Sequence, residues 1–80
     1  MTLSVLAAGL PGIFYHAASP GDPPFKKPGD AVAAGDTVGL IEVMKTFTPI
    51  QAEGAGIFVR YLVANEDSVM PGEPLCEIEG

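Results

Sequence analysis

The sequence predicts a small all-β protein: a flattened β-barrel or sandwich built from two pseudo-symmetric four-stranded halves. Three observations lead to this prediction. Ten glycines and eight prolines interrupt the 80-residue chain every few residues, which leaves little room for a helix of ordinary length. Short runs rich in Val, Ile, Leu, Phe and Thr lie between these breaks, as is typical of β-strands. An internal repeat indicates two halves that share one core.

The repeat is present at two places in the chain. Segment 30–42 aligns without gaps on segment 67–79 at an offset of 37 residues, and Asp, Val, Gly, Ile and Glu recur at matching places. The tripeptide Gly-Ile-Phe at 12–14 recurs at 56–58, at an offset of 44 residues. Because the two offsets differ by seven residues, the first half carries an insertion. It falls within the Pro-rich segment 16–28, which the second half lacks.

The strands of the first half follow from four runs. An apolar run precedes Gly9, a Gly-Ile-Phe-Tyr run follows Pro11, a short pair precedes the Gly35-Asp36 turn, and an apolar run follows that turn. The expected strands are Thr2–Leu6, Gly12–Tyr15, Ala31–Val32 and Thr37–Val43.

The strands of the second half follow from the repeat. Gly54 and the Pro71-Gly72 pair separate its apolar runs, as Gly and Pro do in turns. The expected strands are Phe47–Ala52, Ile57–Val63, Ser68–Val69 and Leu75–Glu79.

The turn that joins the two halves is the most informative point of the sequence. It follows Glu42, whose repeat partner Glu79 lies one residue from the end of the chain, so a two-fold relation places this turn opposite the two termini. Tight hairpins favour Asn-Gly, because both central residues need a positive φ, and Met44-Lys45 is poorly suited to this role. A turn that violates local preference indicates function. Lys45 would present a flexible primary amine on a rigid scaffold, although exposed lysines more often serve only solubility.

Composition argues against several functional classes. Ten acidic and four basic residues give a net charge of −6, which disfavours binding to nucleic acid. A single cysteine, Cys76, excludes an internal disulfide and is expected to be an inert strand residue. The lone His16 supports neither a metal cluster nor a His-paired nucleophile.

Chain length and hydropathy set the remaining expectations. The chain is long enough for one domain, residues 1–80, and leaves little room for a catalytic cleft, so we expect no catalytic residue and no enzyme activity. No apolar run approaches the roughly 20 residues that span a bilayer. We therefore expect a cytoplasmic protein without a membrane partner.

The residues around Lys45 resemble the attachment motif of biotin carboxyl carrier domains, the biotinyl/lipoyl attachment family. Glu42-Val43-Met44-Lys45-Thr46 is similar to Glu-Ala-Met-Lys-Met, with Val43 and Thr46 as departures. The resemblance extends to the Gly35-Asp36-Thr37 turn and to the opening strand Pro11–Tyr15. It also includes Ile50, Ala52 and Gly56, which stand five, seven and eleven residues after the lysine.

This resemblance implies a function as carrier. Biotin would be linked covalently to Lys45, with Glu42, Val43, Met44 and Thr46 forming its site, and a biotin protein ligase would attach it. A biotin carboxylase would carboxylate the biotin, and a carboxyltransferase would pass the carboxyl group to an acceptor, most often an acyl-CoA. The acetyl-CoA carboxylase type is the nearest resemblance, which implies a role in fatty acid biosynthesis.

Segment 16–28, called the thumb below, resembles the protruding loop of such carriers. The resemblance implies that Ser19, Pro20, Gly21 and Asp22 contact biotin, whereas a tolerated surface insertion is the simpler alternative. Two other functions stay open. A lipoyl carrier domain of a 2-oxo acid dehydrogenase complex shares the fold but typically has Asp before the lysine, so Met44 favours biotin. An unmodified docking domain is the third.

Overall fold

The structure is a computed structural model that describes residues 2–80; Met1, which the expected domain includes, lies outside the described residues. All of its regular elements are strands, and three of them have the predicted bounds, while the others differ by one or two residues at one or both ends. The eight strands are β1 (Leu3–Ala7), β2 (Gly12–Tyr15), β3 (Ala31–Val32), β4 (Thr37–Val43), β5 (Thr46–Gln51), β6 (Gly56–Tyr61), β7 (Asp67–Val69) and β8 (Pro74–Glu79). Residues 2–80 contain no helix with the length and apolarity needed to cross a membrane.

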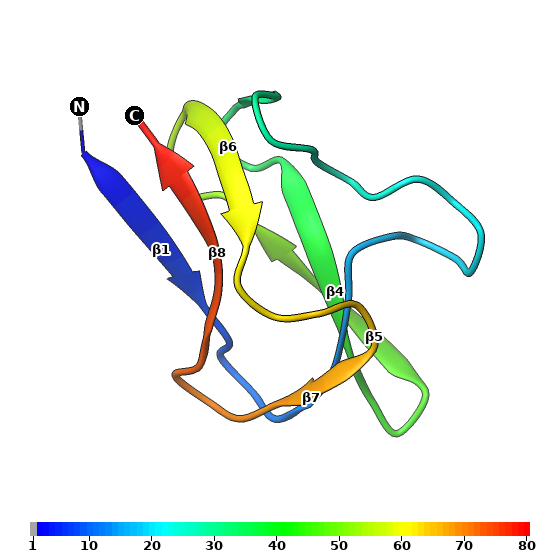
Figure 1. Ribbon diagram of the computed structural model, residues 1–80. Coiled ribbons are helices and arrows are strands. Elements are labelled where there is room, and N and C mark those ends of the chain that lie inside the picture. Colours follow the sequence, from blue (N-terminus) through cyan, green and yellow to red (C-terminus); the bar gives the residue numbers. More distant parts are fainter. Residues whose placement is uncertain (1) are drawn as a thin grey trace.

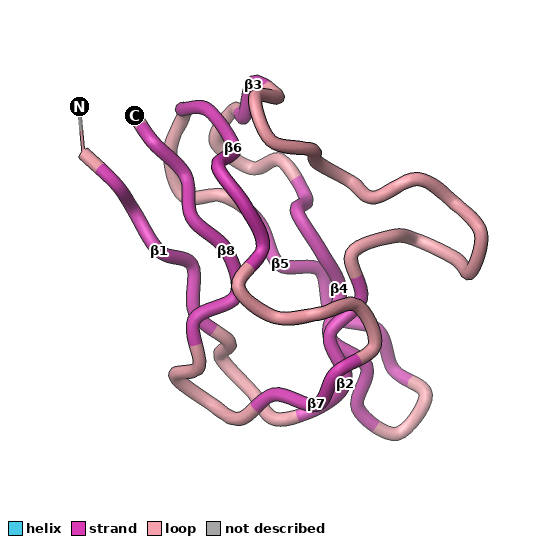
Figure 2. Tube along the Cα trace, in the orientation of Figure 1, coloured by secondary structure: helices cyan, strands magenta, loops and turns pink. Residues whose placement is uncertain are grey.

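The strands form two four-stranded antiparallel sheets with the same internal order. One sheet runs β1-β8-β6-β3 and the other runs β5-β4-β2-β7 (Figures 1 and 2). Exchanging β1 with β5, β2 with β6, β3 with β7 and β4 with β8 converts one order into the other. The repeat in the sequence is therefore a two-fold relation in space, and the predicted fold is confirmed.

The core lies between the sheets and is itself built twice. Phe14 and Phe58, which occupy equivalent places in the repeat, are both almost completely buried, one in each of two apolar clusters. Tyr61 and Ile50 pack against both clusters and join them. The first cluster contains Ala8, Phe14, Ile41, Val63, Val69 and Leu75, and the second contains Val32, Val38, Ala52, Phe58, Cys76 and Ile78.

The glycines at 12 and 56 show why this part of the repeat is preserved. A Cβ on Gly12 would lie 2.4 Å from the carbonyl oxygen of Glu42, and a Cβ on Gly56 would lie 2.5 Å from that of Glu79. Because no side chain fits into such a gap, both halves need glycine where the second strand runs beside its antiparallel partner, the fourth.

The joining hairpin and the chain ends lie at opposite ends of the molecule, as the repeat predicts (Figure 1). Thr2 and Gly80 exchange backbone hydrogen bonds of 2.8 and 3.0 Å at one end. The turn between β4 and β5 forms the other end. Lys45 is thus presented away from both termini.

Candidate functional site: the β4–β5 hairpin and the thumb

The turn between β4 and β5 has the backbone of a two-residue hairpin with both central residues left-handed. Val43 pairs with Thr46, and the residues between them have φ values of 50° at Met44 and 69° at Lys45. Two positive φ values are the signature of the turn type that normally recruits Asn-Gly. For residues with a side chain this conformation costs roughly 1 kcal/mol or more each. The hairpin therefore carries a local strain that the favoured Asn-Gly pair would not have.

The ladder below the turn holds this strained conformation in place. β4 pairs with β5 from Thr37–Gln51 up to Val43–Thr46, and the inward side chains of Val38 and Ile41 are fully buried. Strained turns persist when the surrounding structure specifies them more strongly than the local sequence does. A slip by one residue would turn the buried side chains outward, so the register, and with it the position of Lys45, is well determined.

The five predicted motif residues lie together at this tip but face different surroundings. Met44 is 93% exposed, and Lys45 and Thr46 are also exposed. Val43 is half-buried and packs against the first core cluster. The Val43 departure therefore adds apolar contact inside the sandwich, whereas the Thr46 departure changes the surface beside the lysine.

Glu42 is held at the root of the hairpin by a residue that the motif does not contain. The hydroxyl group of Tyr15 donates a 2.9 Å hydrogen bond to Oε1 of Glu42, and this bond is the main reason that the pKa of Tyr15 is raised. The ring centroid of Tyr15 lies 6.0 Å from that of Phe47, the residue paired with Glu42 across the ladder. We call these three residues, Tyr15, Glu42 and Phe47, the hairpin root.

The thumb leaves the sandwich after β2 and returns before β3 (Figure 1). His16 anchors its first end: its ring stacks on Tyr61 with centroids 3.7 Å apart, and Nε2 lies 2.7 Å from the carbonyl oxygen of Val63. Its backbone N–H donates to Oδ1 of Asn65, and its carbonyl oxygen accepts from the N–H of Phe25. The lone histidine thus has structural partners for its ring, its Nε2 atom and its backbone.

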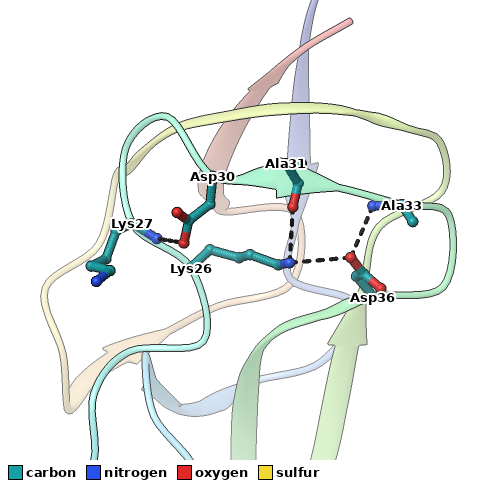
Figure 3. A network of polar contacts seen from close by, with 6 residues as sticks. All are labelled: Lys26, Lys27, Asp30, Ala31, Ala33 and Asp36. Atoms are coloured by element: carbon teal, nitrogen blue, oxygen red, sulfur yellow. Dashed lines mark hydrogen bonds and ion pairs between the residues drawn. The ribbon is translucent and has the colours of Figure 1, made fainter.

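Lys26 anchors the returning end of the thumb (Figure 3). Its Nζ donates to the carbonyl oxygen of Ala31 at 3.0 Å and to Oδ2 of Asp36 at 3.1 Å. The same oxygen of Asp36 accepts from the N–H of Ala33, and these two donors hold the pKa of Asp36 below its ordinary value. The amine of Lys26 is therefore occupied within the fold.

A small cleft lies between the thumb and the loop before β7, which contributes Asn65 and Glu66, with Tyr15 of the hairpin root at its edge. It measures about 120 Å³, and the predicted thumb residues line one of its sides. Small-molecule sites usually measure about 300 Å³ or more, so this cleft could cover only part of a ligand. Its lining consists of Tyr15, Ala17, Ser19, Pro20, Gly21, Asp22, Asn65 and Glu66.

Sequence reasoning did not identify four residues of this region: Tyr15, Phe47, Asn65 and Glu66. For Glu66 a signal was present, because extending the repeat by one residue aligns it with Gly29. Gly29 has a φ of 93° and Glu66 one of 69°, so the second half places a carboxylate in a left-handed position where the first half uses glycine. Tyr15 and Phe47 gave no such signal, because aromatic residues are ordinary in strands.

Cys76 and possible metal ligands are two further features of the described part of the chain. Cys76 is fully buried, and burial raises the pKa of its thiol to about 11, as expected for an inert strand residue. Residues 2–80 hold no group of His, Cys, Asp and Glu side chains suited to a metal ion.

The sequence is similar to that of known biotin carrier proteins. The chain is 38% identical over 76 residues to the biotin carboxyl carrier protein of acetyl-CoA carboxylase from Porphyra purpurea, which covers 95% of this chain and 48% of that protein. It is 39% identical over 75 residues to the carrier protein of the same name from Streptococcus pyogenes serotype M6, covering 94% of this chain and 45% of that protein. The chain thus spans about half the length of these relatives.

A solved structure and a family match extend this comparison. The urea carboxylase of Kluyveromyces lactis superposes with a TM-score of 0.78 at 29% identity, covering 98% of this chain and 6% of that one. The family described as "Biotin-requiring enzyme" matches residues 5–78, nearly the whole chain. The chain therefore belongs to this family, the biotinyl/lipoyl attachment domains.

Proposed function

We propose that this chain is a biotin carboxyl carrier domain whose biotin is linked to the amine of Lys45. The observation that carries the proposal is the strained two-residue turn, in which an exposed lysine occupies a position suited to glycine. Both carrier relatives named above are biotin carriers rather than lipoyl carriers, which favours biotin as the cofactor. The exposed Met44 directly before the lysine favours it as well.

Attachment would form one amide bond. Lys45 would hold the biotin through a bond between its amine nitrogen and the biotin carboxyl carbon, and a biotin protein ligase would activate that carboxyl group with ATP. The activating group would leave with its bonding electron pair, and the nitrogen would lose one proton to solvent or to a base. No role as acid or base is proposed for the residues of the carrier. They present the amine at a determined position.

The carrier would then serve two partner sites. A biotin carboxylase would load the biotin and a carboxyltransferase would unload it, so the tether would raise the local concentration of the carboxylated cofactor at both. A carboxylase of the acetyl-CoA type is the context we propose, in agreement with the names of the relatives. The chain itself would contribute no catalytic residue. A cytoplasmic location stays a prediction.

The thumb is proposed to touch the bound biotin only in part. Ser19, Pro20, Gly21 and Asp22 line the 120 Å³ cleft, which is far smaller than a site that encloses a ligand. Such partial contact suits a carrier, because a deeply buried cofactor could not reach a partner's active site. Chemical-shift changes of Ser19–Asp22 on biotinylation would support this contact. Unchanged shifts would make the thumb a simple insertion.

Intact-mass measurement after co-expression with a biotin protein ligase tests the central proposal. We expect a gain of one biotin in the wild type and in Lys27→Arg, and no gain in Lys45→Arg. Lys27 is the matched control, because it is also exposed and lies in a loop. A second co-expression, with a lipoate ligase, tests the lipoyl alternative. If neither ligase modifies the chain, the docking domain becomes the better explanation.

A further inference from the structure

The contacts of Tyr15 with Glu42 and Phe47 link three neighbouring strands at the base of the turn that carries Lys45. Tyr15 pairs with Leu40 and Ile13 pairs with Glu42, so the side chain of Tyr15 reaches diagonally across the sheet to make its 2.9 Å bond. Its ring also lies beside Phe47 on the third strand. Glu42 is followed by one further pair before the turn, so its carboxylate lies three residues from Lys45.

The pseudo-symmetry shows that the fold itself does not need this bond. Glu42 corresponds to Glu79, which lies at the end without a lysine, and the residue after Phe58 is Val59, which has no hydroxyl group to donate. In that half a bulge places Arg60 opposite Glu77, and these two side chains form a 2.7 Å ion pair instead. The core residues are preserved between the halves, whereas the outer contacts of the hairpin root are not.

The modifying enzyme must distinguish Lys45 from two other lysines. The amine of Lys26 is bound to Asp36 and to a carbonyl oxygen, so it is not available. Lys27 is exposed, as Lys45 is, so neither exposure nor the charge of the side chain distinguishes the two lysines. What surrounds Lys45 is a rigid turn and a carboxylate in a determined orientation. A glutamate without its partner would sample several rotamers, and ordering it would cost binding energy.

We propose that Tyr15 is a positioning residue for the modification of Lys45. Its hydroxyl group orients the carboxylate of Glu42 and its ring supports Phe47, so that the biotin protein ligase meets a preformed hairpin root. This inference rests on the function proposed above. Tyr15 takes no part in bond formation. It acts through Glu42, and the loss of its hydroxyl group should weaken recognition of the carrier rather than the chemistry of the amine.

Initial rates of biotinylation by a purified biotin protein ligase, with biotin and ATP, test the inference. Tyr15→Phe keeps the ring and removes only the hydroxyl group. We expect kcat/KM for this variant to fall about tenfold, as for the loss of a hydrogen bond to a charged group, with the change mostly in KM. Glu42→Gln should show a similar loss. Glu79→Gln, the pseudo-symmetric control, should behave as the wild type does.

Two further measurements separate positioning from general damage. The double variant Tyr15→Phe/Glu42→Gln should lose no more than Glu42→Gln alone, because the two residues act as one unit. Acylation of Lys45 by a small water-soluble reagent should be as fast in Tyr15→Phe as in the wild type, since it needs no recognition of the root.

The outcomes distinguish this inference from the proposed function. A Tyr15→Phe rate within twofold of the wild type, or losses that multiply in the double variant, overturns the inference alone. Equal slowing with the small reagent also overturns it, because the amine itself would have changed. A wild-type chain that accepts no biotin overturns the proposed function together with this inference.

Discussion

Gly12 passes the backbone of Glu42 so closely that a Cβ on Gly12 would lie 2.4 Å from the carbonyl oxygen of Glu42. β2 and β4 are antiparallel neighbours in one sheet, and their close approach also brings the Cγ2 atom of Val43 within 3.0 Å of the same position. The strand that provides Tyr15 and the strand that leads to Lys45 are thereby held at a fixed separation.

Gly12→Ala should consequently destabilise the protein. The added methyl group has no room between two backbones, and overpacking of this kind costs about 1–3 kcal/mol. Denaturant unfolding measures the loss. Gly9→Ala is the matched control, because no atom lies within 4 Å of a Cβ at Gly9, and it should be neutral or slightly stabilising. Equal stability of the two variants would mean that β2 can move away from β4 without penalty.

Lys45→Gly should be more stable than the wild type and lose its modification. Glycine adopts the φ of 69° without penalty, so the free energy of unfolding should rise by about 1 kcal/mol. For a domain of this size such a gain raises Tm by about 4–8 °C. Lys45→Arg is the control: it keeps a side chain in the left-handed position and should melt as the wild type does. If Lys45→Gly were no more stable than Lys45→Arg, the turn would not be strained.

The anchor between the thumb and the β3–β4 turn should make stability depend on pH in the acidic range. The N–H of Ala33 and the amine of Lys26 lower the pKa of Asp36 from its ordinary value of 3.8. The unfolded chain therefore binds a proton at this group more readily, so the contribution is complete above pH 3.8 and is lost as pH falls through the lower folded value.

Unfolding free energies measured from neutral pH down to pH 3 test this dependence. Asp36→Asn should flatten the curve in its acidic part. Lys26→Met should flatten it less, because the hydrogen bond from Ala33 remains. A wild-type curve that Asp36→Asn leaves unchanged would contradict the role of this carboxylate.

Cys76 should resist thiol reagents in the folded protein. It is fully buried, and the pKa of about 11 leaves almost no thiolate at neutral pH. Labelling at pH 8 should therefore become fast only in denaturant. A Met70→Cys/Cys76→Ser variant places a thiol at a position that is 66% exposed and should label quickly without denaturant. Fast labelling of native Cys76 would indicate that β8 opens readily.

The sequence by itself determined the features that depend on local rules. Strand positions, to within one or two residues, followed from β-branched runs between glycines and prolines, and the repeat implied two halves built alike. The turn at Met44-Lys45 followed from the spacing between paired strands. Each of these depends on residues close together in the chain or on a comparison of the chain with itself, so no knowledge of packing was needed.

Only the tertiary structure decided what surrounds the lysine. The hydrogen bond from Tyr15 to Glu42 joins residues that are 27 positions apart in the chain, and the one from His16 to Asn65 joins residues that are 49 positions apart. Such contacts depend on the register between strands and on the face to which each side chain points, and neither is encoded in any short segment. Val43 illustrates the point: the motif places it beside Lys45, and only the structure shows that its half-buried side chain packs against the first core cluster. The position of Lys45 in the turn could be predicted from local sequence, whereas the contacts that support the turn arise only when the two sheets assemble.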